Sequence, residues 1–559
     1  MRLLRPGCLE MWRRARLVLL AGLLLPGLIP SAAEGQGVPV WGRWEGVFTA
    51  EATAPEETRL IVTFTAPSGK TRTVEGFWDG GRVWKVRFQP GEVGTWRYET
   101  RSEPAIPGLD GRQGSFQAQA SAAAENRFLR HGAVGVSADG RYLVHADGTP
   151  FFWLGDTAWN GALLSSAEDW EAYLADRRWK RFTVVQFVTT QWRAAYANAE
   201  GQVAYTGYRQ IRINPEFFRR LDERIDAVNR AGLLAAPVLL WALGDSTQVP
   251  GKLPEDQAIR LARYIVARYQ GHHVVWILAG DEDYGRNGER WRRIGRAVFD
   301  RPGHAPVTLH PQGMQWRFDD FADERWLSLL LYQSGHGDDA GTLAWLHSGP
   351  PAEKWREPPA RPVINAEPPY EGHRAYQSGQ PHSAYNVRRA VYWSLLVAPT
   401  AGVTYGAHGI WSWQTEPGVP LNHRGTGVAR PWREALRFPG SEDMRRVAEL
   451  FESLEWWRLR PAPWLVGEQP EDPARFVGAA ATEAGDQAVI YLPVGGAVRV
   501  ALERLRPGVE ASWFNPRDGS RRPARPGRGG RFAAPGAGDW VLLFVAPEEA
   551  RRERAAGAP

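Results

Sequence analysis

Two acidic residues follow short apolar runs, a pattern that places carboxylates where an active site could use them. The run VVWILA at 274–279 leads through Gly280 to Asp281, and the run PVINA at 362–366 leads to Glu367. An apolar run without polar alternation is typical of a strand buried on both faces, as in a parallel sheet. We therefore expect both acids at the ends of buried strands, where a barrel fold delivers catalytic side chains.

Strand alternation helps to choose among neighbouring acids. If the pleat continues to the end of the run, Asp281 lies on the same side as Ile277 and Ala279. This favours Asp281 over Glu282 and leaves Asp283 to the loop, although both stay open as alternatives. The same rule puts Asn365 on the face of Glu367, where it could orient the carboxylate. For Glu367 the alternative is a strand-end carboxylate that caps a loop.

Two carboxyl groups at the ends of two buried strands suit glycoside hydrolysis. A retaining mechanism needs them about 5 Å apart, one protonated and one ionised. Repulsion between like charges raises the pKa of one of them, which supplies the acid. The sequence thus predicts that the chain brings Asp281 and Glu367 together.

The segment around these acids alternates strands with helices. Amphipathic helices are expected at 166–179, 215–230, 254–269, 289–298, 383–397 and 441–457. Eight expected strands, with helices between most neighbours, predict a (β/α)₈ TIM barrel with insertions, at 126–457. An open doubly wound sheet would need a glycine-rich phosphate loop after an early strand, and LGDTAWN at 154–160 is not one. The eight expected strands are 151–155, 182–188, 233–241, 274–279, 306–310, 327–333, 362–367 and 402–405.

All-β segments flank this barrel. Short alternating strands with a hairpin signal at Asp79-Gly80-Gly81 predict an immunoglobulin-like β-sandwich at 38–119. A second β-sandwich is expected at 458–547, and residues 548–559 form a tail without expected structure.

The first 33 residues have the pattern of a secretory signal peptide. Arg13, Arg14 and Arg16 precede a short apolar core, and Ser31-Ala32-Ala33 offers small residues for cleavage. We therefore expect a secreted or periplasmic protein. The single cysteine, Cys8, lies ahead of the apolar core, so the mature chain would hold no disulfide.

The net charge of the chain does not point to a nucleic acid or membrane partner. The net charge is +6, but five arginines and one glutamate in residues 1–33 account for +4 of it, which leaves about +2 on the mature protein. That balance gives no argument for nucleic acid or an acidic membrane surface. Its 27 tryptophans suit a protein that stacks on sugar rings, although tryptophan is more often part of the core.

Five motifs together resemble a known family. They are LGDTAWN, QFVTTQW, WILAGDED, INAEPPYEG and YWSLLVAPTAGVTYGAHGIWSW. They are similar to the apiosidase-like glycoside hydrolases of family 140, whose barrel follows a β-domain and precedes a domain of collagen-binding type. The resemblance implies a general acid/base at Asp281, a nucleophile at Glu367 and a plant-type polysaccharide substrate. Related barrel glycosidases show Asn-Glu at the fourth strand, where this chain has Gly280-Asp281.

Further polar and aromatic residues stand at the expected strand ends. Each could contact a sugar, and each could equally belong to the core or fix a loop. Neither a HExxH motif nor a cysteine cluster is present, so we expect no metal and no cofactor. The alternative function is a carbohydrate-binding or cell-surface protein that kept the barrel without activity. The candidate substrate-binding residues are Asp156, Trp159, Gln191, Trp192, Trp241, His310, Gln333, His336, Asn365, Trp411 and Trp413.

Overall fold

The computed structural model describes residues 37–121, 125–244, 249–301 and 303–547. The predicted signal peptide and the predicted C-terminal tail lie outside these residues. No helix in the described ranges combines the length and the apolar character that a membrane span needs.

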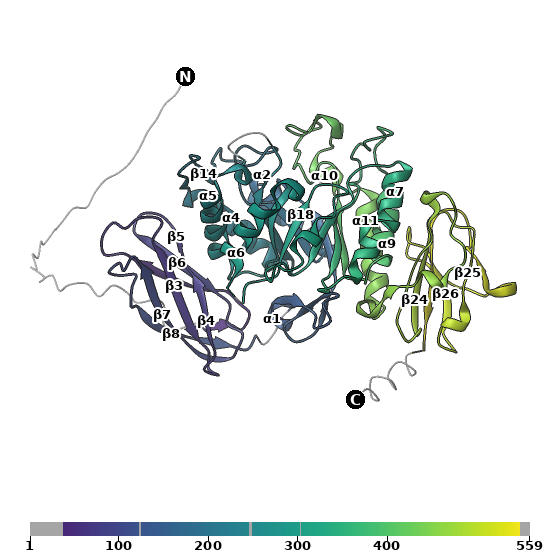
Figure 1. The fold of residues 1–559 in the computed structure, drawn as a ribbon, viewed down its shortest axis with the longest axis horizontal. Coiled ribbons are helices and arrows are strands. Elements are labelled where there is room, and N and C mark those ends of the chain that lie inside the picture. Colours follow the sequence, from purple (N-terminus) through teal and green to yellow (C-terminus); the bar gives the residue numbers. More distant parts are fainter. Residues whose placement is uncertain (1–36, 122–124, 245–248, 302, 548–559) are drawn as a thin grey trace, which may run out of the picture. The chain divides into compact units, whose positions relative to one another are not determined.

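Eight parallel strands form a nearly closed barrel, as predicted (Figure 1). The hydrogen-bonded order is β18-β17-β16-β13-β12-β21-β20-β19. The remaining seam is narrowed by bonds from the Ser328 N–H to the Val307 carbonyl and from the Thr308 hydroxyl to the Leu329 carbonyl, each 2.8 Å. The strands are β12 (Trp153–Thr157), β13 (Val184–Val188), β16 (Leu234–Trp241), β17 (Trp276–Glu282), β18 (Val307–Pro311), β19 (Leu330–Gln333), β20 (Val363–Glu367) and β21 (Gly402–Gly406).

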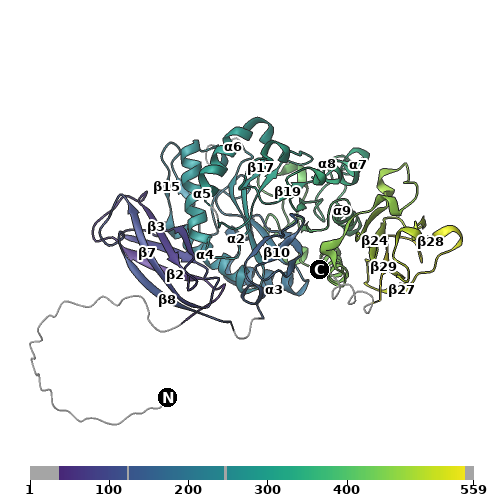
Figure 2. The same cartoon turned by 60° about the horizontal axis from the view of Figure 1, so that its bottom comes forward.

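Helices cover the outside of the barrel, and both views show α4, α5 and α6 outside the strands (Figures 1 and 2). Local sequence signals mark where these helices begin: Ser166 caps α3, and Asn214 caps α4 with Pro215 as its first residue. The sequence missed α7 and placed the start of α6 five residues too late. The longer helices of the barrel domain are α3 (Ala167–Trp179), α4 (Pro215–Arg230), α5 (Glu255–Tyr269), α6 (Tyr284–Phe299), α7 (Ala340–Ser348), α9 (Ala384–Leu396) and α11 (Pro439–Glu452).

The N-terminal β-domain consists of two sheets that share one aromatic core. Phe64 of one sheet stacks on Phe88 of the other, with ring centroids 4.0 Å apart. The predicted Asp79-Gly80-Gly81 turn connects β5 to β6. One sheet contains β1 (Val38–Pro39), β8 (Gln113–Gln119), β7 (Gly94–Glu103), β3 (Arg59–Thr65) and β4 (Thr71–Glu75), and the other β2 (Trp44–Thr49), β6 (Val83–Phe88) and β5 (Phe77–Trp78).

The C-terminal β-domain also has two sheets. Its apolar core includes Trp513, Phe532 and Leu542. The larger sheet contains β22 (Arg460–Pro461), β23 (Gly478–Ala481), β24 (Gln487–Leu492), β29 (Trp540–Val545), β26 (Glu510–Phe514) and β27 (Arg521–Pro523), and the smaller one β25 (Ala497–Arg499) and β28 (Arg531–Ala533).

Candidate active site

A cavity of about 390 Å³ opens where the barrel strands end. Asp281 and Glu367 both line it, so the two acids predicted to meet do lie together. Aromatic rings and hydrogen-bonding side chains make up most of the wall. The full lining is Trp159, Trp192, Arg193, Trp241, Leu243, Asp281, Gln312, Gly313, Gln315, Gln333, Gly335, His336, Glu367, Tyr370, His373, Tyr376, Trp411, His423 and Thr426.

Asp281 reaches the cavity through irregular backbone. Ile277 pairs with Thr308 and Gly280 with His310, so three steps along β17 match two along β18, and a second shift follows before Glu282. Asp281 itself has a positive φ of 51°. The regular alternation assumed from the sequence is therefore wrong at this end of the strand. Bulges commonly redirect side chains next to active sites, and this one does so for Asp281.

The Asp281 carboxyl lies in a setting that favours its protonated form. Burial, followed by the charge of Glu367, raises the pKa of Asp281 to about 6. Gln333 Nε2 donates a hydrogen bond to Asp281 Oδ1 at 2.6 Å and fixes the direction of the carboxyl group. The side chain keeps 21% of its surface exposed, so the acid faces the opening of the cavity.

Glu367, at the end of β20, lies in the opposite electrostatic setting. Burial alone would raise its pKa, but His310 and His336 outweigh burial and lower the pKa of Glu367 to about 2. His336 Nε2 lies 3.0 Å from Glu367 Oε1. The Tyr370 N–H points at the other His336 nitrogen at 3.3 Å, which leaves the Nε2 proton for Glu367.

The acids next to Asp281 have structural partners instead. Glu282 is buried and accepts hydrogen bonds from Asn287 at 2.9 Å and from the Trp291 indole at 2.5 Å. Asp283 stands just before α6 and pairs with Arg286 at 3.2 Å. Neither lines the cavity.

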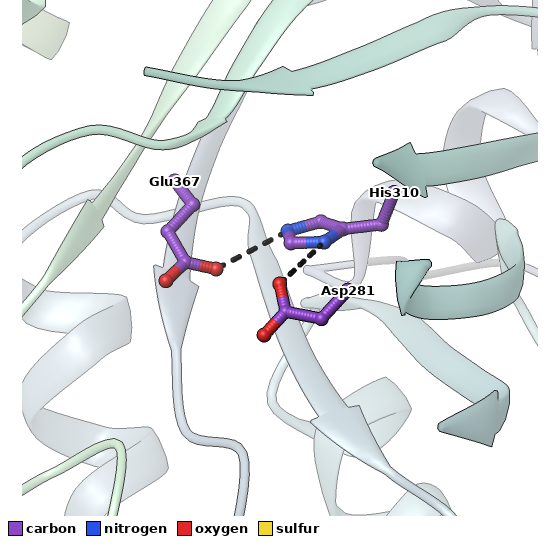
Figure 3. Close-up of side chains that lie close together, drawn as sticks. All are labelled: Asp281, His310 and Glu367. Carbon is purple, nitrogen blue, oxygen red and sulfur yellow. Dashed lines mark ion pairs between the residues drawn. The ribbon is translucent and has the colours of Figure 1, made fainter. Parts of the chain in front are cut away.

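His310 lies between the two acids (Figure 3). Its ring has no exposed surface; Nδ1 is 3.7 Å from Asp281 Oδ1 and Nε2 is 3.3 Å from Glu367 Oε2. One oxygen or nitrogen from each of the three residues falls within 4.8 Å of the others, the spacing that a bound cation needs. However, each ring nitrogen faces a different carboxylate, whereas ligands of a common ion converge on it. We therefore do not assign these residues as metal ligands.

Six of the predicted sugar-contacting residues line the cavity. Trp192 and Trp241 pack against each other with ring centroids 4.2 Å apart, and Trp159 meets Trp241 edge to face. These rings form an apolar wall facing the acid pair. The six are Trp159, Trp192, Trp241, Gln333, His336 and Trp411.

The other five predicted residues, among them the fully buried His310 described above, do not line the cavity, so the prediction that they contact a sugar directly is wrong. Asp156 is fully buried and accepts hydrogen bonds from Tyr173 and Arg177, both at 2.6 Å. Gln191 bonds the backbone at Ala204 and Tyr205.

Asn365 and Trp413 are corrected for different reasons. The Asn365 amide donates to Ser334 and to Ser394 of α9, so it turns toward the helix layer because β20 shifts register before Glu367. Its oxygen does accept the Glu367 N–H at 3.3 Å, so it still fixes the backbone there. Trp413 is buried and stacks on Trp432 at 4.6 Å.

Several cavity residues were not predicted. Tyr370 is the one that the sequence could have indicated, because it follows Glu367 by three positions in the same motif. Its side chain is buried, with 2% of its surface exposed. The others stand on loops, where periodicity carries no information. They are Arg193, Leu243, Gln312, Gly313, Gln315, Gly335, Tyr370, His373, Tyr376, His423 and Thr426.

Comparison with known families agrees with this geometry. The family model described as "Apiosidase-like, catalytic domain" matches residues 137–458, more than half of the chain. The protein belongs to this apiosidase-like family. It is therefore a glycoside hydrolase. Two further models match outside the barrel: a domain of unknown function, DUF5060, at 37–103, and a "putative collagen-binding domain of a collagenase" at 461–545.

Solved structures share the fold of this apiosidase-like chain. A glycoside hydrolase family 5 protein from Bacteroides vulgatus is 22% identical with a TM-score of 0.65, covering 75% of this chain and 94% of its own. A second glycoside hydrolase is 24% identical with a TM-score of 0.62, covering 75% and 97%. No curated protein sequence matches the chain.

Proposed function

We propose that this apiosidase-like protein is a secreted retaining glycoside hydrolase, with Glu367 as nucleophile and Asp281 as general acid/base. The observation that carries the proposal is the spacing of the pair: a carboxylate oxygen of each lies within 4.8 Å of the other. Retaining enzymes hold their carboxyl groups about 5–5.5 Å apart, whereas inverting enzymes leave about 6.5–9.5 Å for a water molecule.

The two environments support this division of roles. Glu367, whose pKa is lowered to about 2, is ionised and ready to attack the anomeric carbon. Asp281, whose pKa is raised to about 6, holds a proton in mildly acidic solution and can give it to the leaving oxygen. After the sugar is bound to Glu367, the Asp281 carboxylate takes a proton from water, and the hydroxide equivalent releases the sugar.

We further propose a plant-type polysaccharide or oligosaccharide side chain as substrate, with an apiosyl linkage as the first to test. The family membership supports that choice, and the tryptophan wall of the cavity supports binding of a sugar ring. Loops on a barrel change specificity freely, so the linkage must come from experiment.

The test is a screen of the mature protein against pectic and hemicellulosic fragments, with released sugars identified and the anomer of the first product read by NMR. Glu367→Gln and Asp281→Asn should lower kcat by about 10²–10⁴-fold while binding persists. Asp283→Asn is the matched control, because this carboxylate is two residues from Asp281 and lies outside the cavity. With aryl glycosides whose leaving group needs no proton, Asp281→Asn should keep the first step.

Two results would contradict the proposal. An inverted first product would exclude a covalent intermediate on Glu367. Binding of fragments without turnover by the unmodified protein would instead favour a carbohydrate-binding protein.

A further inference from the structure

His310 is the one histidine in the cavity region whose two ring nitrogens both face carboxylates. It sits on β18 with no exposed surface, and neither nitrogen has a well-aligned hydrogen-bond partner within the described residues. Asp281 on β17 faces Nδ1 at 3.7 Å, and Glu367 on β20 faces Nε2 at 3.3 Å (Figure 3). The Trp159 ring, which carries no charge, meets the His310 ring edge to face with centroids 5.5 Å apart.

The protonation state of this ring follows from that geometry. A neutral imidazole has one N–H and one lone pair, so it can donate a hydrogen bond to only one of the two acids at a time. An imidazolium has two N–H groups and can donate toward both acids. Because the ring is cut off from water, only the cation can donate to either acid at every stage without a change of tautomer. Burial lowers the pKa of His310, but Glu367 and then Asp281 outweigh burial and raise it above its ordinary value.

We propose that His310 is a positioning residue that stays an imidazolium throughout the reaction and neutralises whichever of the two carboxylates carries the negative charge. This inference rests on the proposed function, because it needs Asp281 and Glu367 to exchange charge. Its chemistry adds no step to the retaining mechanism and no new proton carrier.

The charges balance at each stage. Before the reaction Glu367 is negative and Asp281 is protonated, so the cation pairs through Nε2. As a Glu367 oxygen bonds to the anomeric carbon, the glycosidic bond breaks and the Asp281 proton passes to the leaving oxygen. Asp281 is then negative and the cation pairs through Nδ1. When Asp281 takes a proton from water and the ester is cleaved, the charge returns to Glu367.

Other charged groups near the cavity make different contacts. His336 lies 3.0 Å from Glu367 and forms no ion pair with Asp281 in the described part of the chain, so it serves as the matched control. Arg193 lines the cavity and also lowers the pKa of Asp281. Its effect on that pKa is smaller than the effects of burial, Glu367, His310 and Gln333. A substitution of His310 should therefore affect both acids, whereas one of His336 should affect Glu367 alone.

The first test compares the pH dependence of kcat/KM for His310→Gln and His336→Gln. Loss of a nearby opposite charge raises a carboxyl pKa by about 1–3 units. We expect the alkaline limb, set by Asp281, to move up by at least one pH unit in His310→Gln and to stay in place in His336→Gln. An unmoved limb in His310→Gln, or an equal shift in both variants, would overturn the proposal.

The second test needs no substrate. In ¹⁵N-histidine NMR of the mature protein at pH 7.5, we expect an imidazolium signal that disappears in His310→Gln and persists in His336→Gln. Nine of the twelve histidines have pKa values lowered by burial and should be neutral there. If His310→Gln does not fold, the unmodified protein still decides: no imidazolium at pH 7.5 overturns the inference.

The two tests separate the inference from the proposed function. A persistent His310 cation in a protein that hydrolyses no substrate would refute the enzyme mechanism and leave the charge assignment standing. Hydrolysis with retention and a neutral His310 would refute this inference alone.

Discussion

Asp281 and Glu367 carry the same chemical group in surroundings that move their pKa values in opposite directions. Burial acts on both, and the difference comes from their partners. Glu367 faces two histidines, at 3.0 and 3.3 Å. Asp281 faces one of these, His310, at 3.7 Å, and receives a hydrogen bond from the neutral Gln333 amide and the repulsion of Glu367. Environments that separate two carboxyl pKa values define an acid and a base from one functional group.

The activity should therefore be confined to acidic solution. The acid step needs protonated Asp281, whose pKa is raised to about 6. Above that pH the protonated fraction falls tenfold per unit, so kcat/KM should fall by the same factor. Glu367 stays ionised down to about pH 2 and sets no limit in the measurable range. Initial rates from pH 3 to 9 would check this, and a rate that is still constant at pH 8 would contradict it.

At the residue scale the sequence identified the acid pair but not the backbone geometry that brings Asp281 to the cavity. Asp281 was predicted from a regular pleat, and the structure brings it to the cavity through a bulge and a positive φ. For Asp156 the sequence left a sugar contact and a structural role equally open, because its partner Arg177 comes into contact only after α3 packs on the barrel. Strand ends indicate which residues are near a barrel mouth, but tertiary packing decides which of them reach it.

At the element scale the strands and most helices were predictable, because apolar runs and caps are local signals. All eight barrel strands were found, whereas α7 was missed. This helix has only nine residues, and they are largely apolar on all sides. A short, uniformly apolar segment has no helical period to read. The bulge in β17 left no signal other than Gly280, which is also consistent with an ordinary turn.

Gly280 is required for the shape of that strand end. A methyl group at this position would lie 2.5 Å from the Trp241 ring, well inside van der Waals contact. Gly280→Ala should push Trp241 into the cavity or displace Asp281, and a displacement of about 1 Å can lower kcat by about 10²-fold. Steady-state kinetics and melting temperature together would check this.

Gly288→Ala is the matched control for that substitution. Gly288 lies within α6, and the nearest atom to an added methyl group is 4.0 Å away. Alanine in a helix interior stabilises a protein by about 0.5–1 kcal/mol relative to glycine. This variant should therefore keep its activity and have a slightly higher melting temperature. Equal kinetics for Gly280→Ala and the unmodified protein would show that the bulge tolerates a side chain.

At the scale of the whole molecule, the pH that favours activity opposes stability. Several histidines are buried with burial as the main cause of a lowered pKa: about 3 for His273, and about 4 for His347, His382 and His408. An unfolded histidine takes up a proton near pH 6.5, so between about pH 4 and 6.5 the unfolded chain binds more protons than the folded one. The stability these groups contribute is complete above pH 6.5 and is lost as the pH falls.

His347 offers the clearest test of this conflict, because it lies outside the cavity and its ring stacks on Phe476 at 4.1 Å. His347→Phe keeps an aromatic ring there and removes the titrating group, at the cost of the contact with the Pro473 carbonyl. Between pH 7 and 4.5 the unmodified protein should lose up to about 3 kcal/mol more of its free energy of unfolding than the variant, since one pKa unit corresponds to about 1.4 kcal/mol. Urea unfolding at both pH values measures the difference. Identical losses in the two proteins would mean that His347 is already protonated in the folded state or that the unfolded chain keeps it buried.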